Sequence, residues 1–301
     1  EEHFKAFCTR ILRPYSDRFW DEGCPAPDIK GFKATIKLKP GVQIPFRQPY
    51  HLSKFDQTRL KYLYEEAEAE GKVERFELGE QPPAICTPVF MVDKKGSLIG
   101  RKVGDFTMFN KFSEDYYYPA PEADQVLMNA CGKTYHSLMD CVWGFSQISV
   151  DEETEKLLST ITPFGVYKSK RLPEGVKQGP SIYQHVQDSA LGAEFKPNGE
   201  KLCNVFFDDT HVGDYDLEEH YANLARVLTL ARKVNIQYRL VKCTFLQREV
   251  LLLGFICGKD GRKPDPKKVE QLKNWPAYIS CQSIHSHYAF CNYLRVFFGP
   301  E

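Results

Sequence analysis

Two adjacent aspartates, Asp208 and Asp209, lie inside a stretch that is otherwise typical of a β-strand, C-N-V-F-F-D-D-T-H-V over 203–212. Strands avoid aspartate, and a second carboxylate beside the first adds repulsion. The segments 205–207 and 210–212 are strand-like, so we predict that the pair lies at a hairpin turn. The two side chains then point to opposite sides of the ribbon, and only one of them faces a given site directly.

A third carboxylate, Asp140, ends the strand-like segment Y-H-S-L-M-D over 135–140. If these strands are neighbours in one sheet, Asp140 and Asp208 converge at one edge. Converging carboxylates without a cation cost several kcal/mol, so the arrangement favours a divalent metal ion. Mg²⁺ fits because it takes oxygen ligands and keeps waters that substrate phosphates replace. Two such ions roughly 3.5 to 4 Å apart hold the attacking and leaving oxygens of a phosphoryl transfer. For Asp208 and Asp209 alone, a solvated turn is the alternative, and spacing leaves both open.

The elements that must position these residues alternate between strand and helix patterns. Ser53 caps a predicted helix to about residue 70, and a hairpin over 87–106 turns at D-K-K-G. An amphipathic helix is predicted over 217–234. Further predicted elements are strands at 34–38 and 251–256 and helices at 122–129 and 181–191. The fold class is therefore mixed α/β (α+β).

Composition excludes several classes of protein. The 301 residues hold 40 Lys plus Arg and 40 Asp plus Glu, so the net charge gives no support to nucleic-acid binding, although a local basic groove remains open. The longest apolar run falls short of the roughly 20 residues of a membrane span, and no signal peptide opens the chain. Ten scattered cysteines indicate reduced thiols and an intracellular protein of unspecified compartment.

The order of several motifs resembles the reverse transcriptase of gypsy-type LTR retrotransposon Pol polyproteins. F-F-D-D matches that family's aromatic-x-Asp-Asp box, and S-L-M-D-C-V-W-G-F-S-Q-I (137–148) resembles its first palm motif. The remaining motifs follow in family order: T-P-F-G-V-Y (162–167), L-P-E-G-V-K-Q-G-P-S-I-Y-Q (172–184), L-L-G-F-I (252–256) and R-K-P-D-P-K-K-V-E-Q-L-K-N-W-P (262–276).

The resemblance implies a polymerase right hand with fingers, palm and thumb. It places an N-terminal arm, similar to a protease–polymerase spacer, at 1–33 and a thumb at 259–301. The fingers are expected in two pieces, 34–121 and 148–178, and the palm in two pieces, 122–147 and 179–258.

The resemblance also implies roles for single residues. Asp140 and Asp208 hold two Mg²⁺ ions, for which Mn²⁺ can substitute, and Asp209 assists them. Phe145 packs under the sugar of the incoming nucleotide and rejects a 2′-hydroxyl. Arg101 lies against its base and α-phosphate, where a delocalised fork suits better than an ammonium. Lys94 or Lys95 approaches the γ-phosphate, and Lys242 approaches the pyrophosphate leaving group.

Some residues depart from the family pattern. Glu174 stands beside the nucleotide pocket where the family has a neutral residue, and at roughly 8 Å from a phosphate it costs about 2 kcal/mol at an effective dielectric near 20. The family's Asn-Ala-Pro is Gln178-Gly179-Pro180, and Ala289 replaces a glycine of the template-primer helix.

Two functions are therefore expected from this sequence. The first is an RNA-directed DNA polymerase acting on an RNA template, a DNA primer and dNTPs. The alternative is a catalytically impaired, domesticated right hand that serves as a structural subunit with protein partners.

Overall fold

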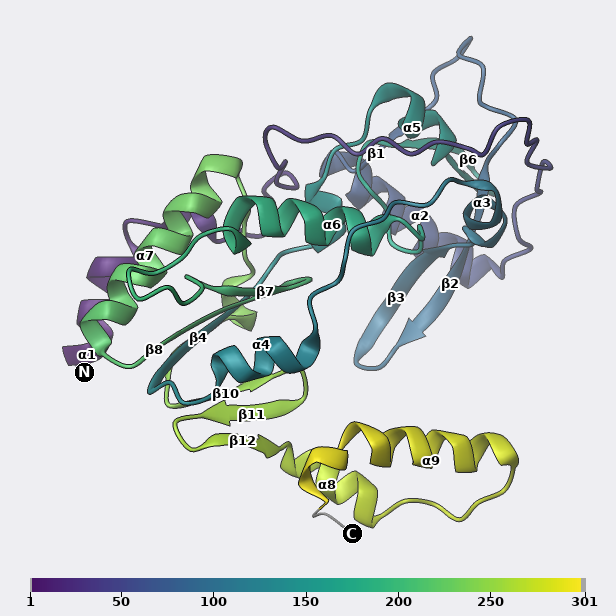
Figure 1. Cartoon of the computed structure of the whole chain (residues 1–301). Helices are drawn as coiled ribbons and strands as arrows, with labels where there is room; N and C mark the ends of the chain where they lie inside the picture. Colours follow the sequence, from purple (N-terminus) through teal and green to yellow (C-terminus); the bar gives the residue numbers. More distant parts are fainter. Residues whose placement is uncertain (1, 299–301) are drawn as a thin grey trace.

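A computed structural model describes residues 2–298 and arranges them in three sheets with helices packed around them (Figure 1). The strands are β1 (Val73–Arg75), β2 (Thr87–Lys94), β3 (Ser97–Gly104), β4 (Tyr135–Asp140), β5 (Thr160–Thr162), β6 (Gly165–Ser169), β7 (Asn204–Phe206), β8 (Asp209–Asp214), β9 (Thr244–Gln247), β10 (Glu249–Leu252), β11 (Phe255–Gly258) and β12 (Gly261–Pro264).

Several helices begin at a polar N-cap, among them those capped by Ser53, Asp151 and Asp216. They are α1 (Glu2–Phe7), α2 (Lys54–Ala69), α3 (Thr107–Phe112), α4 (Ala123–Ala130), α5 (Glu152–Leu157), α6 (Gly179–Gln187), α7 (Leu217–Val234), α8 (Pro266–Lys273) and α9 (Cys281–Tyr293). Shorter helical turns are η1 (Cys8–Leu12), η2 (Ser16–Arg18), η3 (Gly144–Gln147), η4 (Asp188–Gly192), η5 (Leu240–Lys242) and η6 (Arg295–Phe297).

The central sheet has the strand order β7-β8-β4-β9 and is antiparallel. Helices α6 and α7 lie over one face of it (Figure 1). Their apolar stripes supply the main core, in which Ile182, Leu224 and Val227 are completely or almost completely buried with Met139 of β4. Because α7 carries its apolar residues at helical spacing, one face packs on the sheet and the opposite face stays in water.

A second sheet has the order β1-β6-β5-β2-β3, with one parallel pair, β2 with β5. Helix α2 packs on it through Leu60 and Tyr64, which join Val89 and Tyr167 in a separate small core. The β2–β3 hairpin projects from this sheet (Figure 1). This sheet is separate from the central sheet, and the chain passes between the two sheets from β3 to β4, from β4 to β5 and from β6 to β7.

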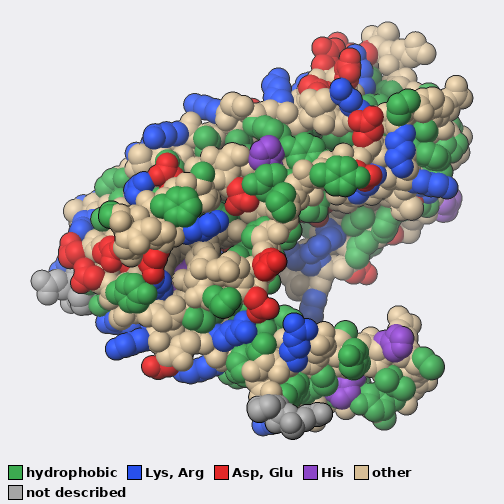
Figure 2. All heavy atoms as spheres, in the orientation of Figure 1, with side chains coloured by type: hydrophobic (Ala, Val, Ile, Leu, Met, Phe, Trp, Pro, Cys, Tyr) green, Lys and Arg blue, Asp and Glu red, His purple; other side chains and the backbone are tan. Residues whose placement is uncertain are grey.

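The third sheet, β10-β11-β12, packs with α4 and Leu294 in another core cluster. Helices α8 and α9 follow it, and neither has a fully buried residue. Figure 2 shows a deep hollow between this C-terminal part and the rest of the molecule, with Lys and Arg side chains on the side formed by the β2–β3 hairpin.

Two predicted strands differ from the structure. Segment 251–256 is not one strand but the hairpin β10–β11, because Leu253 and Gly254 both adopt positive φ (47° and 76°) and reverse the chain. Segment 34–38 is extended but pairs only at isolated bridges, Ala34 with Val150 and Leu38 with Ser113, so it forms no regular strand.

Candidate active site

Three carboxylates gather at one edge of the central sheet. Asp140 is the last residue of β4 and stands opposite Asp209, the first residue of β8. Asp208 lies in the two-residue turn between β7 and β8. Its carbonyl oxygen accepts a hydrogen bond from the Cys141 backbone N–H at 2.9 Å, which ties the turn to the residue that follows Asp140.

The side chain of Gln184 in α6 holds the turn that carries Asp208. Phe207 has a φ of 49°, an unfavourable conformation for a residue with a bulky side chain. Its backbone N–H donates to Oε1 of the completely buried Gln184 at 2.9 Å, and Nε2 of Gln184 donates to the Val205 carbonyl at 3.3 Å. The same amide therefore fixes both sides of the turn.

The Asp208 carboxylate lies directly against Gly144 of η3. A Cβ atom on Gly144 of η3 would lie 1.9 Å from its Oδ1 atom, so no residue other than glycine fits there without a shift. A hydrogen bond from the buried Tyr183 stabilises the charged form of the same carboxylate. The first residues after Asp140 and the middle of α6 thus shape the space around Asp208.

The pKa values of both turn aspartates are raised. Burial and then the neighbouring charges of Asp140 and Asp208 raise the pKa of Asp209 to about 6. Asp208 is exposed at the surface, yet protein atoms packed around its carboxylate, followed by Asp140, raise its pKa as well. The raised pKa values show that nearby positive charge does not balance the negative charge of the three carboxylates.

One lysine partly supplies that charge. Nζ of Lys242, in η5, lies 3.0 Å from Oδ1 and 3.2 Å from Oδ2 of Asp140. Lys242 also lowers the pKa values of Asp208 and Asp209, although it does not offset the effects that raise them. The site therefore carries three acids and one base in close range.

The three aspartates fit a magnesium ion for which the protein supplies only some of the ligands. Within residues 2–298, no group of three or more His, Cys, Asp or Glu side chains is close enough to hold a metal ion. Mg²⁺ is ordinarily bound through one or two carboxylates plus waters and substrate phosphates, rather than in an all-protein cage. Oxygen ligands at Asp140, Asp208 and Asp209, with an excess of negative charge, suit that mode.

Phe145 of η3 forms a wall next to the carboxylates. Its ring is half-buried and contacts Tyr183 edge-to-face, with centroids 5.4 Å apart. A Cβ on Gly179, at the start of α6, would meet the Phe145 ring at 3.8 Å, which is ordinary contact. The ring is thus supported from behind by α6 and keeps one part exposed.

The predicted phosphate-contacting residues of the fingers lie on a different element. Arg101 is in β3 opposite Val92, Lys94 ends β2, and Lys95 is in the turn of the same hairpin. All three cations are exposed, and in the described part of the chain none pairs with the three aspartates. The hairpin is tied to α2 by an ion pair between Arg59 and Asp93, with Nη1 and Oδ1 2.9 Å apart.

Glu174 lies in an exposed turn that Gly175, with a φ of 94°, makes possible. Its negative charge is close enough to contribute to the raised pKa of Asp208. The structure therefore adds Glu174 to the carboxylate end of the sheet.

Sequence reasoning assigned no role to Tyr183, Gln184 or Gly144, although all three shape the position of Asp208. A signal was present for Gln184, because an amide side chain in the apolar face of a predicted helix requires buried partners. The pairing of Lys242 with Asp140 joins positions 102 residues apart, so local patterns did not indicate it.

Solved structures with the same arrangement define the fold. The foamy viral protease-reverse transcriptase in complex with an RNA/DNA hybrid matches with a TM-score of 0.83 at 18% identity, covering 98% of this chain and 38% of that one. The same enzyme in a form with double-stranded DNA matches with a TM-score of 0.85 at 19% identity, covering 98% and 50%. The fold is therefore the polymerase right hand, as the sequence predicted.

Sequence comparison then gives the family. The model of the reverse transcriptase (RNA-dependent DNA polymerase) family matches residues 95–257, so this chain belongs to that family. The Pol polyprotein from transposon opus of Drosophila melanogaster is 33% identical over 215 residues, which is 70% of this chain and 21% of that protein. The polyprotein from transposon 412 of the same species is 29% identical over 304 residues, 98% of this chain and 24% of that protein. The chain thus spans about a fifth to a quarter of these relatives.

Other features of the described residues are compatible with the expectations from composition. No helix within residues 2–298 is long and apolar enough to cross a membrane. All ten cysteines are free thiols, and four of them are buried.

Proposed function

We propose that this chain carries out RNA-directed DNA synthesis, adding nucleotides from dNTPs to the 3′-hydroxyl of a primer on an RNA template. The observation that carries the proposal is the cluster of Asp140, Asp208 and Asp209 at one sheet edge, with raised pKa values at the last two. Membership of the reverse transcriptase family supports this function over the alternative of a purely structural subunit.

Asp140 and Asp208, assisted by Asp209, would supply part of the ligands of a divalent metal, Mg²⁺ or Mn²⁺, which when bound supplies positive charge to the reacting phosphate and the primer hydroxyl. Asp208 is pre-positioned for this task because Gln184 and Gly144 fix its turn. Asp140 and Asp209 face each other across adjacent strands, so the protein presents oxygen ligands from rigid elements.

The nucleotide would lie between this edge and the β2–β3 hairpin. Phe145 would pack under its sugar and would reject a 2′-hydroxyl. Arg101 would contact the triphosphate with its planar fork, and Lys94 or Lys95 would approach the terminal phosphate. The hollow beside α8 and α9 offers space for a template-primer duplex (Figure 2).

The proposal also assigns the three parts of the hand. Fingers at 34–121 and 148–178 are supported by the five-stranded sheet, whose strands come from both pieces. A palm at 122–147 and 179–258 is supported by the four-stranded sheet, which takes β4 from the first piece and β7 to β9 from the second. A thumb at 259–301 begins at β12, which pairs with β11 across that boundary.

Primer extension on an RNA template with Mg²⁺ or Mn²⁺ tests the function. Asp208→Asn should lower the rate at least about 1000-fold, because several kcal/mol of charge stabilisation depend on the metal ligands. The matched control is Asp260→Asn, which changes an exposed aspartate in the β11–β12 turn and should leave the rate unchanged. Incorporation that survives in Asp208→Asn, or that is absent from the folded wild-type protein, would contradict the proposal.

A further inference from the structure

The ion pair between Lys242 and Asp140 occupies the carboxylate that the proposed function needs for metal. Nζ of Lys242 is within 3.2 Å of both oxygens of Asp140, so the ammonium is placed across the whole carboxylate. A compact, strongly hydrated ammonium is a point charge and can exchange with another cation. The two cations, lysine and metal, therefore compete for the same ligand.

The backbone of Lys242 is fixed, whereas among residues 2–298 its ammonium is held by the pair with Asp140 alone. The Arg239 N–H donates to the Asp140 carbonyl at 2.9 Å, and the Lys242 N–H donates to the Arg239 carbonyl at 2.9 Å. These bonds attach η5 directly to the end of β4. The Lys242 side chain is 55% exposed, so its four-carbon stem can swing into water without loss of core packing.

The charge balance of the site favours such an exchange. Three aspartates and Glu174 share one lysine here, so a divalent cation compensates the cluster better than the single charge of Lys242. Asp140 is only 24% exposed, and a carboxylate in that position is costly without a partner. A resident cation thus compensates the charge of Asp140 and orients its carboxylate while no metal is bound.

We propose that Lys242 is a resident counter-ion of Asp140, which a divalent metal ion displaces, and that the released ammonium then becomes available to a phosphate of the incoming nucleotide. This inference rests on the proposed function. It gives Lys242 two successive partners, a carboxylate in the metal-free protein and a phosphate in the loaded one. The residue is therefore a positioning residue before it contacts substrate.

Metal binding without nucleotide or nucleic acid tests the exchange. We would measure Mn²⁺ affinity by the electron paramagnetic resonance signal of free Mn²⁺ for the wild type and for Lys242→Met. Removing the competing ammonium should tighten Mn²⁺ binding by about five-fold, the upper range of a partly exposed ion pair. Unchanged or weaker binding by Lys242→Met would overturn the inference.

A matched control separates direct competition from the general field of a positive charge. Arg239→Met removes the same charge three residues earlier, at a side chain that lies near Trp20 and Trp143 instead of Asp140. It should change Mn²⁺ affinity by less than about two-fold, because exposed charges at longer range are screened. An equal gain in both variants would overturn the competition.

A second measurement uses the wild-type protein and does not depend on any variant's affinity. In protein labelled with ¹⁵N-lysine, the Nζ resonance assigned to Lys242 by its absence in Lys242→Met should shift as Mg²⁺ is added. The midpoint of that shift should equal the metal dissociation constant. A resonance that stays in place while Mg²⁺ binds would overturn the inference.

The two proposals fail differently. Mn²⁺ binding that Asp140→Asn abolishes, without tightening in Lys242→Met, would leave the proposed function intact and overturn only the exchange. A folded wild-type protein that binds no Mn²⁺ at a site dependent on Asp140 would overturn both. In the Asp140→Asn background, Lys242→Met should have no further effect on Mn²⁺ affinity.

Discussion

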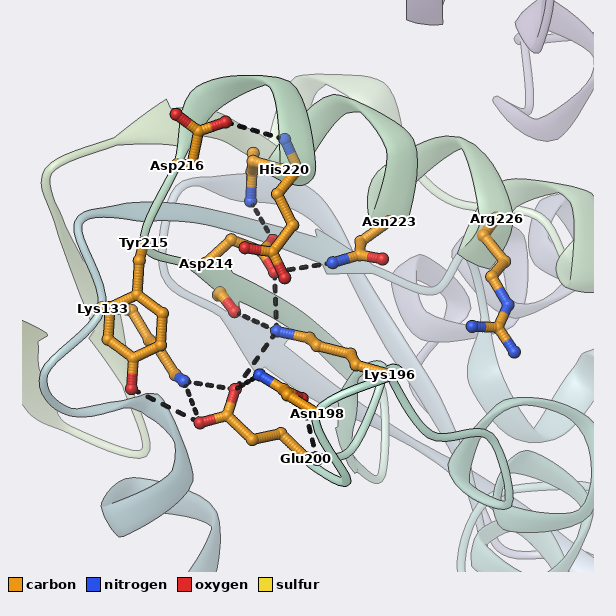
Figure 3. A network of polar contacts seen from close by, with 12 residues as sticks. Lys133, Lys196, Asn198, Glu200, Asp214, Tyr215, Asp216, His220, Asn223 and Arg226 are labelled. Atoms are coloured by element: carbon orange, nitrogen blue, oxygen red, sulfur yellow. Dashed lines mark hydrogen bonds and ion pairs between the residues drawn. The ribbon is translucent and has the colours of Figure 1, made fainter.

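The two ends of the β4–β8 strand pair hold two clusters of charge with opposite character. At one end, Asp140 and Asp209 face each other, and Lys242 forms an ion pair with Asp140. At the other end Tyr135 pairs with Asp214, whose carboxylate is completely buried. Figure 3 shows that second end, where dashed lines connect Asp214 to partners on every side.

The buried end is fully compensated. Asp214 accepts from Nζ of Lys196 at 2.6 Å, from Nδ1 of His220 at 2.6 Å and from the Asn223 amide at 2.8 Å. Burial opposes ionisation of Asp214, but the contacts with His220 and Lys196 outweigh it, so its pKa lies below the usual value. At the other end the pKa of Asp209 is raised instead. A carboxylate with all partners in place stabilises the fold, whereas one without them is available for a ligand.

Geometry alone does not distinguish a catalytic site from a structural one. Ser137 Oγ lies 2.8 Å from Nε2 of His220, and Nδ1 of His220 lies 2.6 Å from Asp214. This is the arrangement of a serine-hydrolase triad. All three side chains are completely buried, so a substrate cannot reach the hydroxyl. The constellation therefore serves packing, and access separates it from the aspartate edge.

The largest expected effect comes from breaking the buried end. Asp214→Asn removes the closer charge partner of Lys196, which is 2% exposed, and leaves its buried ammonium with the longer ion pair to Glu200 at 3.8 Å. The free energy of unfolding should fall by about 3 to 5 kcal/mol. Urea denaturation of this variant and of the surface control Asp260→Asn measures the effect. A loss below about 1 kcal/mol, the range of a surface pair, would show that the two ends do not differ as described.

The second prediction concerns two buried histidines next to this network. His136 Nε2 donates to the Lys133 carbonyl at 3.1 Å, so its Nδ1 accepts from Nε2 of His211 at 3.0 Å, and both rings are neutral. Burial lowers the pKa of His211 to about 3 and also lowers that of His136. Below pH 6.5 the unfolded chain binds protons that the native protein does not. Stability present above pH 6.5 is therefore lost as the pH falls toward 3.

For His211 alone, the free energy of unfolding should fall by about 2 kcal/mol between pH 6.5 and pH 4.5. Urea unfolding at several pH values measures this slope. His211→Gln, which keeps a donor toward His136, should flatten the slope, whereas His285→Gln on the surface of α9 should not. An equal slope in all three proteins would exclude His211 as its source.

Local elements were predictable from the sequence, but contacts between distant segments were not. Helix α7 was predicted because its apolar spacing is a local signal. The β10–β11 hairpin was missed because its turn uses Leu253 and Gly254 inside an uninterrupted apolar run, without the usual Asn or Asp. A left-handed leucine is a tertiary effect that local propensity does not indicate.

The candidate site divides in the same way. Asp208 and Asp209 stood out because carboxylates are rare within strands, and Asp140 stood out because it ends a second strand-like segment. The buried Asp214 carried no such signal, because its partners Lys196 and His220 surround it only after folding. A sequence shows which residues are charged, whereas the partners that neutralise a buried charge are known only from the folded structure.

The third prediction concerns the stability of the other end of the strand pair, the open end, where Asp140 and Asp209 face each other. In EDTA at pH 8, Asp209→Asn should raise the free energy of unfolding by about 2 kcal/mol, because burial and then the charges of Asp140 and Asp208 disfavour a charged Asp209. Its folded pKa, about 6, is above the unfolded value of 3.8, so the wild type regains this stability as the pH falls from about 6 to below 4. The difference between the two proteins should therefore vanish near pH 4. A variant no more stable than the wild type at pH 8 would mean that the aspartates do not repel each other.

The smallest expected effect concerns Glu174, the fourth acid at the open end. Because Glu174 adds negative charge near Asp208, it should also repel the phosphates of a nucleotide. The side chain is exposed, so salt screening reduces the interaction to about 1 kcal/mol, and Glu174→Gln should lower the KM for dNTP about five-fold with kcat unchanged. Steady-state primer extension at two salt concentrations measures this, with Glu153→Gln in α5 as an equal charge change elsewhere. The KM difference should shrink at higher salt, since it is electrostatic. A lowered kcat in Glu174→Gln would instead give this carboxylate a part in the reaction, and the open end would then contain four working acids.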